Sequence, residues 1–138
     1  MNDYDDVLNE LSEYKEKYIS ILSEFNNYKK RTIKEKEELV KTGTEKVILS
    51  ILPIVDDFER AFEYNEVDDG ITLIYRKLID TLSSLGVERI KIENGTEFNT
   101  DEHIAVLKSG NGNFIIDEIL SGYRLYDKVI RHAKVIVG

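Results

Sequence analysis

The sequence predicts an α+β protein that is mostly helical, with a long N-terminal helix, a helical bundle and a small C-terminal β domain. Three observations support this class. The chain contains no proline before Pro53, and before that point a single glycine, Gly43. In this stretch apolar side chains recur at alternating spacings of three and four residues, as in a coiled-coil helix. After Gly86 the spacing changes to the two-residue alternation of strands.

The N-terminal apolar residues form a heptad seam that begins at Tyr4. A helix from Tyr4 to Leu52 would be roughly 70 Å long at 1.5 Å per residue. The rest of the chain is too short to cover such a rod, so we expect a second copy of the chain to cover the seam. The residues expected at this dimer interface are Tyr4, Leu11, Tyr18, Ile21, Phe25 and Tyr28.

The charges that flank the seam indicate how the two copies are oriented. A parallel dimer places each g residue opposite the next e residue of its partner. This gives two attractive pairs and one repulsive pair, namely Glu10 with Lys15, Glu24 with Lys29, and Arg31 with Lys36. Each exposed pair contributes only a few tenths of a kcal/mol. The sequence therefore favours a parallel dimer by a small margin.

The seam loses its register near Gly43. Thr42 and Glu45 match a capping box, so we expect the helix to bend or loosen there. A second apolar face follows from Ile48 to Phe62, and Pro53 is expected to kink it about one turn earlier.

A further amphipathic helix is expected from Ile71 to Leu85, after a polar connection at 65–70. Gly86 is well placed as its C-terminal cap. Two such helices from each of two chains make a four-helix bundle. The residues expected to form the bundle contacts are Ile48, Ile51, Val55, Phe58, Ile74, Leu78 and Leu82.

The remaining residues predict a small antiparallel β domain of about 50 residues, close to the lower limit for independent stability. Turn signals separate the apolar runs. The strands are expected at 87–92, 104–107, 114–120, 123–125 and 134–137. The predicted regions are thus a coiled-coil stalk at 1–45, a dimeric bundle at 46–85 and a β domain at 86–138.

Composition excludes several classes of function. The net charge of −8 argues against a general nucleic-acid binder, because phosphates would be repelled. The absence of cysteine excludes disulfides and thiolate zinc sites. No apolar run reaches transmembrane length, and the acidic first ten residues are unlike a targeting peptide. We therefore expect a cytoplasmic protein with neither a membrane nor a nucleic acid as its partner.

No catalytic, metal or cofactor motif is visible. His103 and His132 lack neighbours at metal-ligand spacing and are expected to be surface or capping residues. The doublets 56–57 and 68–69 contain paired aspartates. Adjacent residues on a helix point in different directions, so neither doublet is a ready acid–base pair. A carboxylate enzyme is therefore the weakest of three readings, behind a binding protein and a structural coiled-coil tether.

Two features fit a docking function as well as a structural one. Lys29, Lys30 and Arg31 form a basic island in an acidic chain. This island is either a solvated flank of the coiled coil or a patch for an acidic partner. Gly70 either helps the chain turn into the next helix or leaves the backbone bare for a partner.

Five segments, in this order, closely resemble the GrpE family. They are FNNYKKRTIKEKEEL, ILPIVDDFERAF, GITLIYRKLIDTLSSLGVERI, FNTDEHIAV and GYRLYDKVIRHAKVIV. The resemblance covers nearly the whole chain from Phe25 onward. It implies a parallel homodimer that acts as the nucleotide exchange factor of a DnaK-type chaperone. Such a factor grips the chaperone's nucleotide-binding domain and holds one lobe outward, so that ADP leaves and ATP enters.

The same resemblance implies which residues touch the chaperone. Lys29 matches a basic residue of the stalk contact, and Gly70 matches the glycine that opens the last bundle helix. Lys128 matches a basic residue of the β-domain contact, and Arg131 belongs to the C-terminal signature. Polar residues in the stalk predict that it melts before the bundle, and the resemblance likewise suggests a thermal switch.

Overall fold

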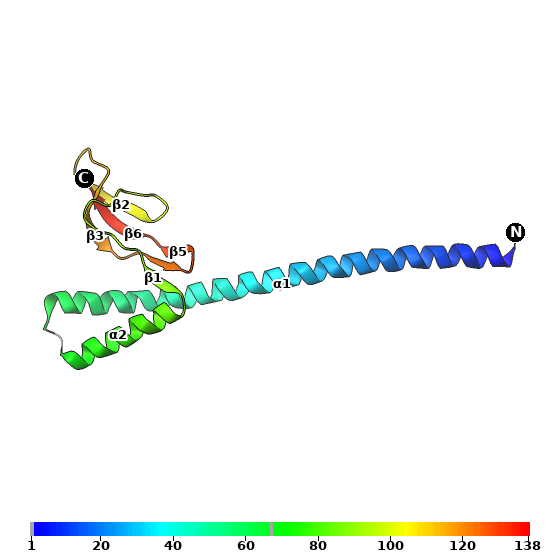
Figure 1. Ribbon diagram of the computed structural model, residues 1–138, viewed down its shortest axis with the longest axis horizontal. Helices are drawn as coiled ribbons and strands as arrows, with labels where there is room; N and C mark the ends of the chain where they lie inside the picture. Colours follow the sequence, from blue (N-terminus) through cyan, green and yellow to red (C-terminus); the bar gives the residue numbers. More distant parts are fainter. Residues whose placement is uncertain (1, 67) are drawn as a thin grey trace. The chain divides into compact units, whose positions relative to one another are not determined.

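The computed structural model describes residues 2–66 and 68–138, which divide into two units at 1–43 and 44–138 (Figure 1). Helix α1 (Asp3–Tyr64) begins in the first unit and ends in the second, and it is followed by α2 (Asp69–Ser84). The strands are β1 (Val87–Arg89), β2 (His103–Lys108), β3 (Ile115–Leu120), β4 (Tyr123–Leu125), β5 (Lys128–Arg131) and β6 (Ala133–Val137). The predicted α+β class, mostly helical, is confirmed.

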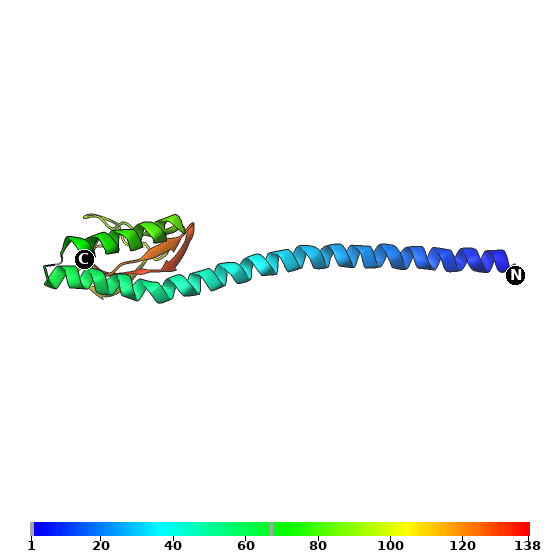
Figure 2. The same cartoon turned by 90° about the horizontal axis from the view of Figure 1, so that it is seen from below.

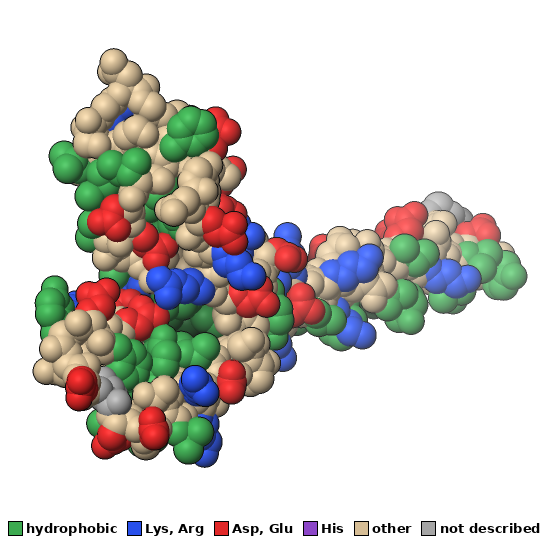
Figure 3. Space-filling view, turned by 60° about the vertical axis from the view of Figure 1, so that its left-hand side comes forward, with side chains coloured by type: hydrophobic (Ala, Val, Ile, Leu, Met, Phe, Trp, Pro, Cys, Tyr) green, Lys and Arg blue, Asp and Glu red, His purple; other side chains and the backbone are tan. Residues whose placement is uncertain are grey.

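The first unit is a single helix with no core of its own. The side chain of Asn2 accepts a hydrogen bond from the Tyr4 N–H at 3.2 Å, as an N-terminal cap does. Acidic residues in the first turn suit the positive end of the helix dipole. The seam residues from Tyr4 to Tyr28 are 48–66% exposed, and no residue from 2 to 43 is buried. Green apolar side chains are accordingly visible along this helix in Figure 3.

The capping box expected at Thr42 and Glu45 does not form. Helix α1 is continuous from Asp3 to Tyr64, so Thr42 and Glu45 do not cap a new helix. A glycine costs about 1 kcal/mol in a helix interior. The helix-forming residues on either side of Gly43 outweigh that cost. Pro53 also lies inside the helix without ending it.

In the second unit, α2 runs alongside the last turns of α1 (Figures 1 and 2). The Asp68 side chain caps α2 by accepting from the Ile71 N–H at 2.9 Å. Gly86 follows the helix with φ 90°, which confirms its expected role as the C-terminal cap residue. One core joins both helices to β1 and β4. Its buried residues are Ile48, Leu52, Val55, Leu82, Val87 and Tyr123.

Part of the expected dimer interface lies in this core. Ile48, Val55 and Leu82 are 3%, 0% and 4% exposed within one chain, so they have almost no surface to offer a second chain. Ile51 and Leu78 are half-buried against the same core. The periodicity identified the apolar face correctly but could not tell that α2, β1 and β4 of the same chain cover it.

The strands form two three-stranded sheets. The first has the order β1-β4-β5 and is antiparallel. The second has the order β2-β6-β3, in which β3 is antiparallel to β6 and β2 is parallel to it. The β domain was expected to be antiparallel throughout, and the pairing of β2 with β6 is the exception. Strand β5 was not expected from the sequence, because four residues with a charge at each end show no clear alternation.

Gly122, between β3 and β4, lies where backbone segments approach closely. A Cβ there would come within 2.5 Å of the Ala133 nitrogen. No side chain fits at this position, which explains why it is occupied by glycine. A second core beside it contains Ile115, Ala133, Val135 and Val137. Among the described residues, no helix has the length and apolar character that crossing a membrane requires.

Candidate functional site

Three of the four residues singled out by the resemblance lie in the second unit. Lys128 and Arg131 are the two ends of β5, and Gly70 is in the first turn of α2. Lys29 lies in the first unit, where its ammonium is 5.5 Å from the centroid of the Phe25 ring. Figure 3 shows acidic and basic side chains next to one another where the strands of the second unit meet its helices.

Lys128 is a surface cation that already faces a carboxylate. Its Nζ lies 2.7 Å from Oε2 of Glu45, on the α1 part of the second unit. The lysine side chain is 71% exposed and the glutamate side chain 24% exposed. An ammonium has three N–H donors, so Lys128 can keep this bond and still donate to an incoming acidic group.

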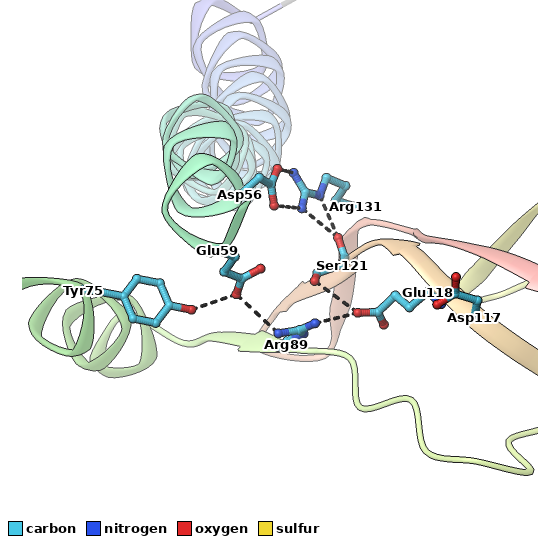
Figure 4. Close-up of polar contacts among 8 residues, drawn as sticks. All are labelled: Asp56, Glu59, Tyr75, Arg89, Asp117, Glu118, Ser121 and Arg131. Atoms are coloured by element: carbon cyan, nitrogen blue, oxygen red, sulfur yellow. Dashed lines mark hydrogen bonds and ion pairs between the residues drawn. The ribbon is translucent and has the colours of Figure 1, made fainter. Parts of the chain in front are cut away.

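Arg131 is held much more firmly. Its guanidinium binds Asp56 through two parallel hydrogen bonds of 2.6 and 2.7 Å, and it donates to the Ser121 carbonyl at 2.8 and 3.0 Å (Figure 4). The guanidinium also lies 5.1 Å from the centroid of the Tyr123 ring. The two charged side chains are only 17% and 13% exposed. This geometry fastens the first sheet to α1 and leaves Arg131 little freedom to reach outward.

A second network of polar side chains lies beside the pair formed by Asp56 and Arg131 (Figure 4). Arg89 binds Glu59 at 3.3 Å and Glu118 at 2.6 Å. Tyr75, on α2, donates its hydroxyl to Glu59 at 2.8 Å. Helices and strands are thus joined by polar contacts as well as by the core. This network could not be predicted from the sequence, because its residues lie far apart in the sequence and only the fold brings them together.

The pKa shifts have clear causes in this network. Burial raises the pKa of Tyr75, and the hydrogen bond to Glu59 adds to the effect. Burial and the negative charge of Glu59 raise the pKa of Tyr123 to about 12. Burial acts to lower the pKa of Arg89, but Glu118 and Glu59 outweigh it and the pKa is raised. These tyrosines and this arginine therefore keep one charge state near neutral pH and are poorly suited to acid–base catalysis.

The cavity beside these charges is small and polar. Its volume is about 150 Å³, and its lining includes Asp56, Glu59, Arg89 and Glu118. Small-molecule sites are mostly apolar and occupy roughly 300–1,000 Å³. The cavity therefore does not fit an ordinary ligand pocket.

The aspartate doublets also have structural roles. Asp56 binds Arg131, whereas its neighbour Asp57 lies 3.6 Å from Arg60 on the surface. Asp68 caps α2. Within 2–66 and 68–138, no group of three or more potential ligands is arranged to hold a metal ion.

The two histidines differ in their surroundings. Of the two roles expected from the sequence, surface or capping, the surface position is wrong for His103, which is buried and whose Nδ1 accepts from the Asn99 N–H at 3.0 Å. Burial lowers the pKa of His103. His132 is half-buried beside β6.

Gly70 has a local constraint of its own. A Cβ at this position would lie 3.2 Å from the Asp68 Oδ1 that caps the helix. Its φ is not in the left-handed region, so backbone strain does not require glycine here. Alanine would already make this tight contact, so the cap alone gives a reason for glycine at this position.

The predicted interface residues differ in what they leave exposed. Ile74 is 60% exposed and Phe58 is half-buried, with its ring 6.0 Å from that of Tyr75. The six predicted stalk residues are all well exposed. Apolar surface is therefore available to a second chain along the first unit and at Ile74.

Comparison with known proteins identifies a family. Residues 2–138 match the family model described as GrpE. A protein named "Protein GrpE" from Bacteroides thetaiotaomicron is 44% identical over 140 residues, which cover 93% of this chain and 72% of that protein. Proteins of the same name from Porphyromonas gingivalis strain W83 and Methanosphaera stadtmanae are 38% and 41% identical, over 94% and 93% of this chain and 72% and 78% of theirs.

Proposed function

Because the chain belongs to the GrpE family, we propose that it is a co-chaperone that promotes nucleotide exchange on a DnaK-type chaperone. The match over residues 2–138 carries this proposal. The protein acts by binding rather than by covalent chemistry. It grips the chaperone's nucleotide-binding domain and stabilises an open form from which ADP leaves. Only a difference in affinity for the open and closed forms can shift that equilibrium.

The active species in this proposal is a parallel homodimer. The exposed seam of the first unit supports it, because an isolated polar helix gains little from folding without a covering partner. Sedimentation should show an elongated dimer. A compact monomer at micromolar concentration would contradict the proposal.

The contact residues proposed for the chaperone are Lys29, Gly70, Lys128 and Arg131. Lys29 and Lys128 are exposed cations suited to an acidic surface. Arg131 contributes by positioning, since its guanidinium is occupied by Asp56 and Ser121. Gly70 gives a partner close access to the start of α2.

Release of a fluorescent ADP analogue from the cognate DnaK-type chaperone tests the function directly. The parent protein should accelerate release. Lys29→Glu and Lys128→Glu should each weaken this effect through slower association, most strongly at low salt. Lys91→Glu, which changes the charge at another exposed lysine, is the matched control. If the parent leaves the release rate unchanged, the chain is a structural tether instead.

Gly70→Asp separates binding from folding. An acid in the first turn of a helix is tolerated, so the dimer and its melting temperature should stay close to those of the parent. Binding and ADP release should fall strongly if the partner closes on this point. Gly70→Ala is the control, because it adds a Cβ close to Asp68 without adding a charge. Normal exchange by a folded Gly70→Asp dimer would show that this glycine serves only the helix cap.

We also propose that the stalk is a thermal sensor. Its seam contains polar Thr32 and Glu35, and Gly43 lies at its end. Two helical melting transitions are expected, with exchange activity lost at the lower one. A single cooperative loss of helix, with activity constant up to it, would argue against a sensor.

A further inference from the structure

The turn between β4 and β5 contains an unusual backbone conformation. Leu125 pairs with Lys128, so Tyr126 and Asp127 form a two-residue turn. Tyr126 has φ 52° and is the sole non-glycine residue with a positive φ among those the structure describes. Glycine and asparagine are the residues that usually occupy such positions. A tyrosine is therefore strained here.

Contacts with Gly86 hold the strained residue in place. The Tyr126 N–H donates to the Gly86 carbonyl at 2.8 Å. The aromatic ring lies so close to Gly86 that a Cβ there would come within 2.6 Å of Cε1 and Cζ. The ring therefore ties the turn to the segment that leaves α2.

Burial does not explain the choice of tyrosine. The residue is 72% exposed, so little of the ring is removed from water. Asparagine would relieve the backbone strain at the cost of that small contact. Strained residues that persist in this way are often found at functional positions.

Two residues further along the chain, the same hairpin presents Lys128. Its ammonium reaches Glu45 at 2.7 Å. The hairpin is thus anchored on one side through Tyr126 to the end of α2, and on the other through Lys128 to α1. Loss of the ring contact would leave only the backbone hydrogen bond on that side, and the lysine would lie on a freer turn.

We propose that Tyr126 is a positioning residue that sets the place of Lys128 for its acidic partner. The inference rests on the proposed function, because Lys128 has this task only if a chaperone binds. Tyr126 acts through the hairpin and does not itself touch the partner. A lysine held in place loses less conformational freedom on binding than one on a mobile turn.

A double-mutant cycle tests this proposal. Tyr126→Asn suits the turn and removes the ring. Chaperone affinity should fall about three- to tenfold in the parent background, within the range of couplings between interacting residues. In the Lys128→Gln background it should not fall further. Tyr126→Phe, which keeps the ring, should bind like the parent. Tyr64→Asn is the control for loss of an exposed tyrosine elsewhere in the second unit.

Two results would overturn the proposal. An equal loss in both backgrounds would mean that the ring touches the partner directly. Unchanged affinity in the parent background would mean that the lysine needs no such support.

Amide hydrogen exchange of the free protein gives a readout that does not depend on the chaperone. Tyr126→Asn should speed exchange at the amide of residue 126 and at neighbouring β4–β5 amides, with α2 unchanged. Unchanged exchange would overturn the anchoring role even if affinity falls. A different result is that the parent protein fails to bind the chaperone while Tyr126→Asn still speeds the local amide exchange. That result would overturn the proposed function and leave the anchoring role intact.

Discussion

The two units treat their apolar side chains in opposite ways. The first unit exposes every apolar residue of its seam from Tyr4 to Tyr28, whereas the second buries Leu52 and Val55 completely. Both stretches of α1 show the same kind of helical periodicity. The difference is that α2 and the strands cover α1 only in the second unit. The same apolar pattern thus corresponds to a core within the chain in the second unit. In the first unit it corresponds to an exposed face that only another chain could cover.

Dilution is the most direct way to distinguish the behaviour of the two units. Dilution to a concentration below the dimer's dissociation constant should dissociate it by mass action. The first unit should then lose most of its helix, since an uncovered helix is marginal in water. The second unit should keep its amide protection. Circular dichroism and hydrogen exchange measure the two responses, and a helix content that does not depend on concentration would remove the distinction.

Paired leucine substitutions sharpen the same comparison. Leu52→Ala should cost about 2–5 kcal/mol, because it leaves a cavity in the core of the second unit. Leu11→Ala should affect stability only at concentrations at which a partner covers the seam. Denaturant unfolding at two protein concentrations measures both. A loss for Leu11→Ala that does not change with concentration would show that its contact is within the chain.

The polar contacts of the second unit should be nearly as important as its apolar ones. Asp56→Asn leaves the half-buried Arg131 without its charged partner, and we expect a loss of about 2–4 kcal/mol. Asp57→Asn, at the exposed neighbouring position, should stay within about 0.5 kcal/mol of the parent. Equal stabilities for the two variants would mean that the clamp between α1 and the strands contributes little.

The smallest expected effect is a pH dependence confined to the second unit. Burial lowers the folded-state pKa of His103, so the unfolded chain takes up a proton first as the pH falls. The contribution of His103 to the free energy of unfolding should therefore be fully present above the ordinary histidine pKa of about 6.5. It should decline as the pH falls below that value. His103→Gln should flatten this decline, whereas His132→Gln should only weaken it, because burial is the larger cause of the lowered His103 pKa and the His132 charge a smaller one. Urea unfolding across this pH range measures the effect.

Local patterns were sufficient for much of the architecture. The heptad seam, the Gly86 cap and the change of period after it predicted the helices and most strands, because periodicity and capping act over a few neighbouring residues. The quoted segments also predicted the family. What they could not reveal is a short strand such as β5, or that Thr42 and Glu45 lie inside α1 without capping a new helix.

Tertiary structure alone decided which charges far apart in the sequence meet. Asp56 and Arg131 are 75 residues apart and Glu45 and Lys128 are 83 apart, and neither pair follows a local spacing rule. The same holds for the parallel pairing of β2 with β6 and for the burial of Ile48, Val55 and Leu82 within one chain. The sequence determined which faces are apolar. Only the folded chain decided what covers each face, because that depends on contacts between segments far apart in the sequence.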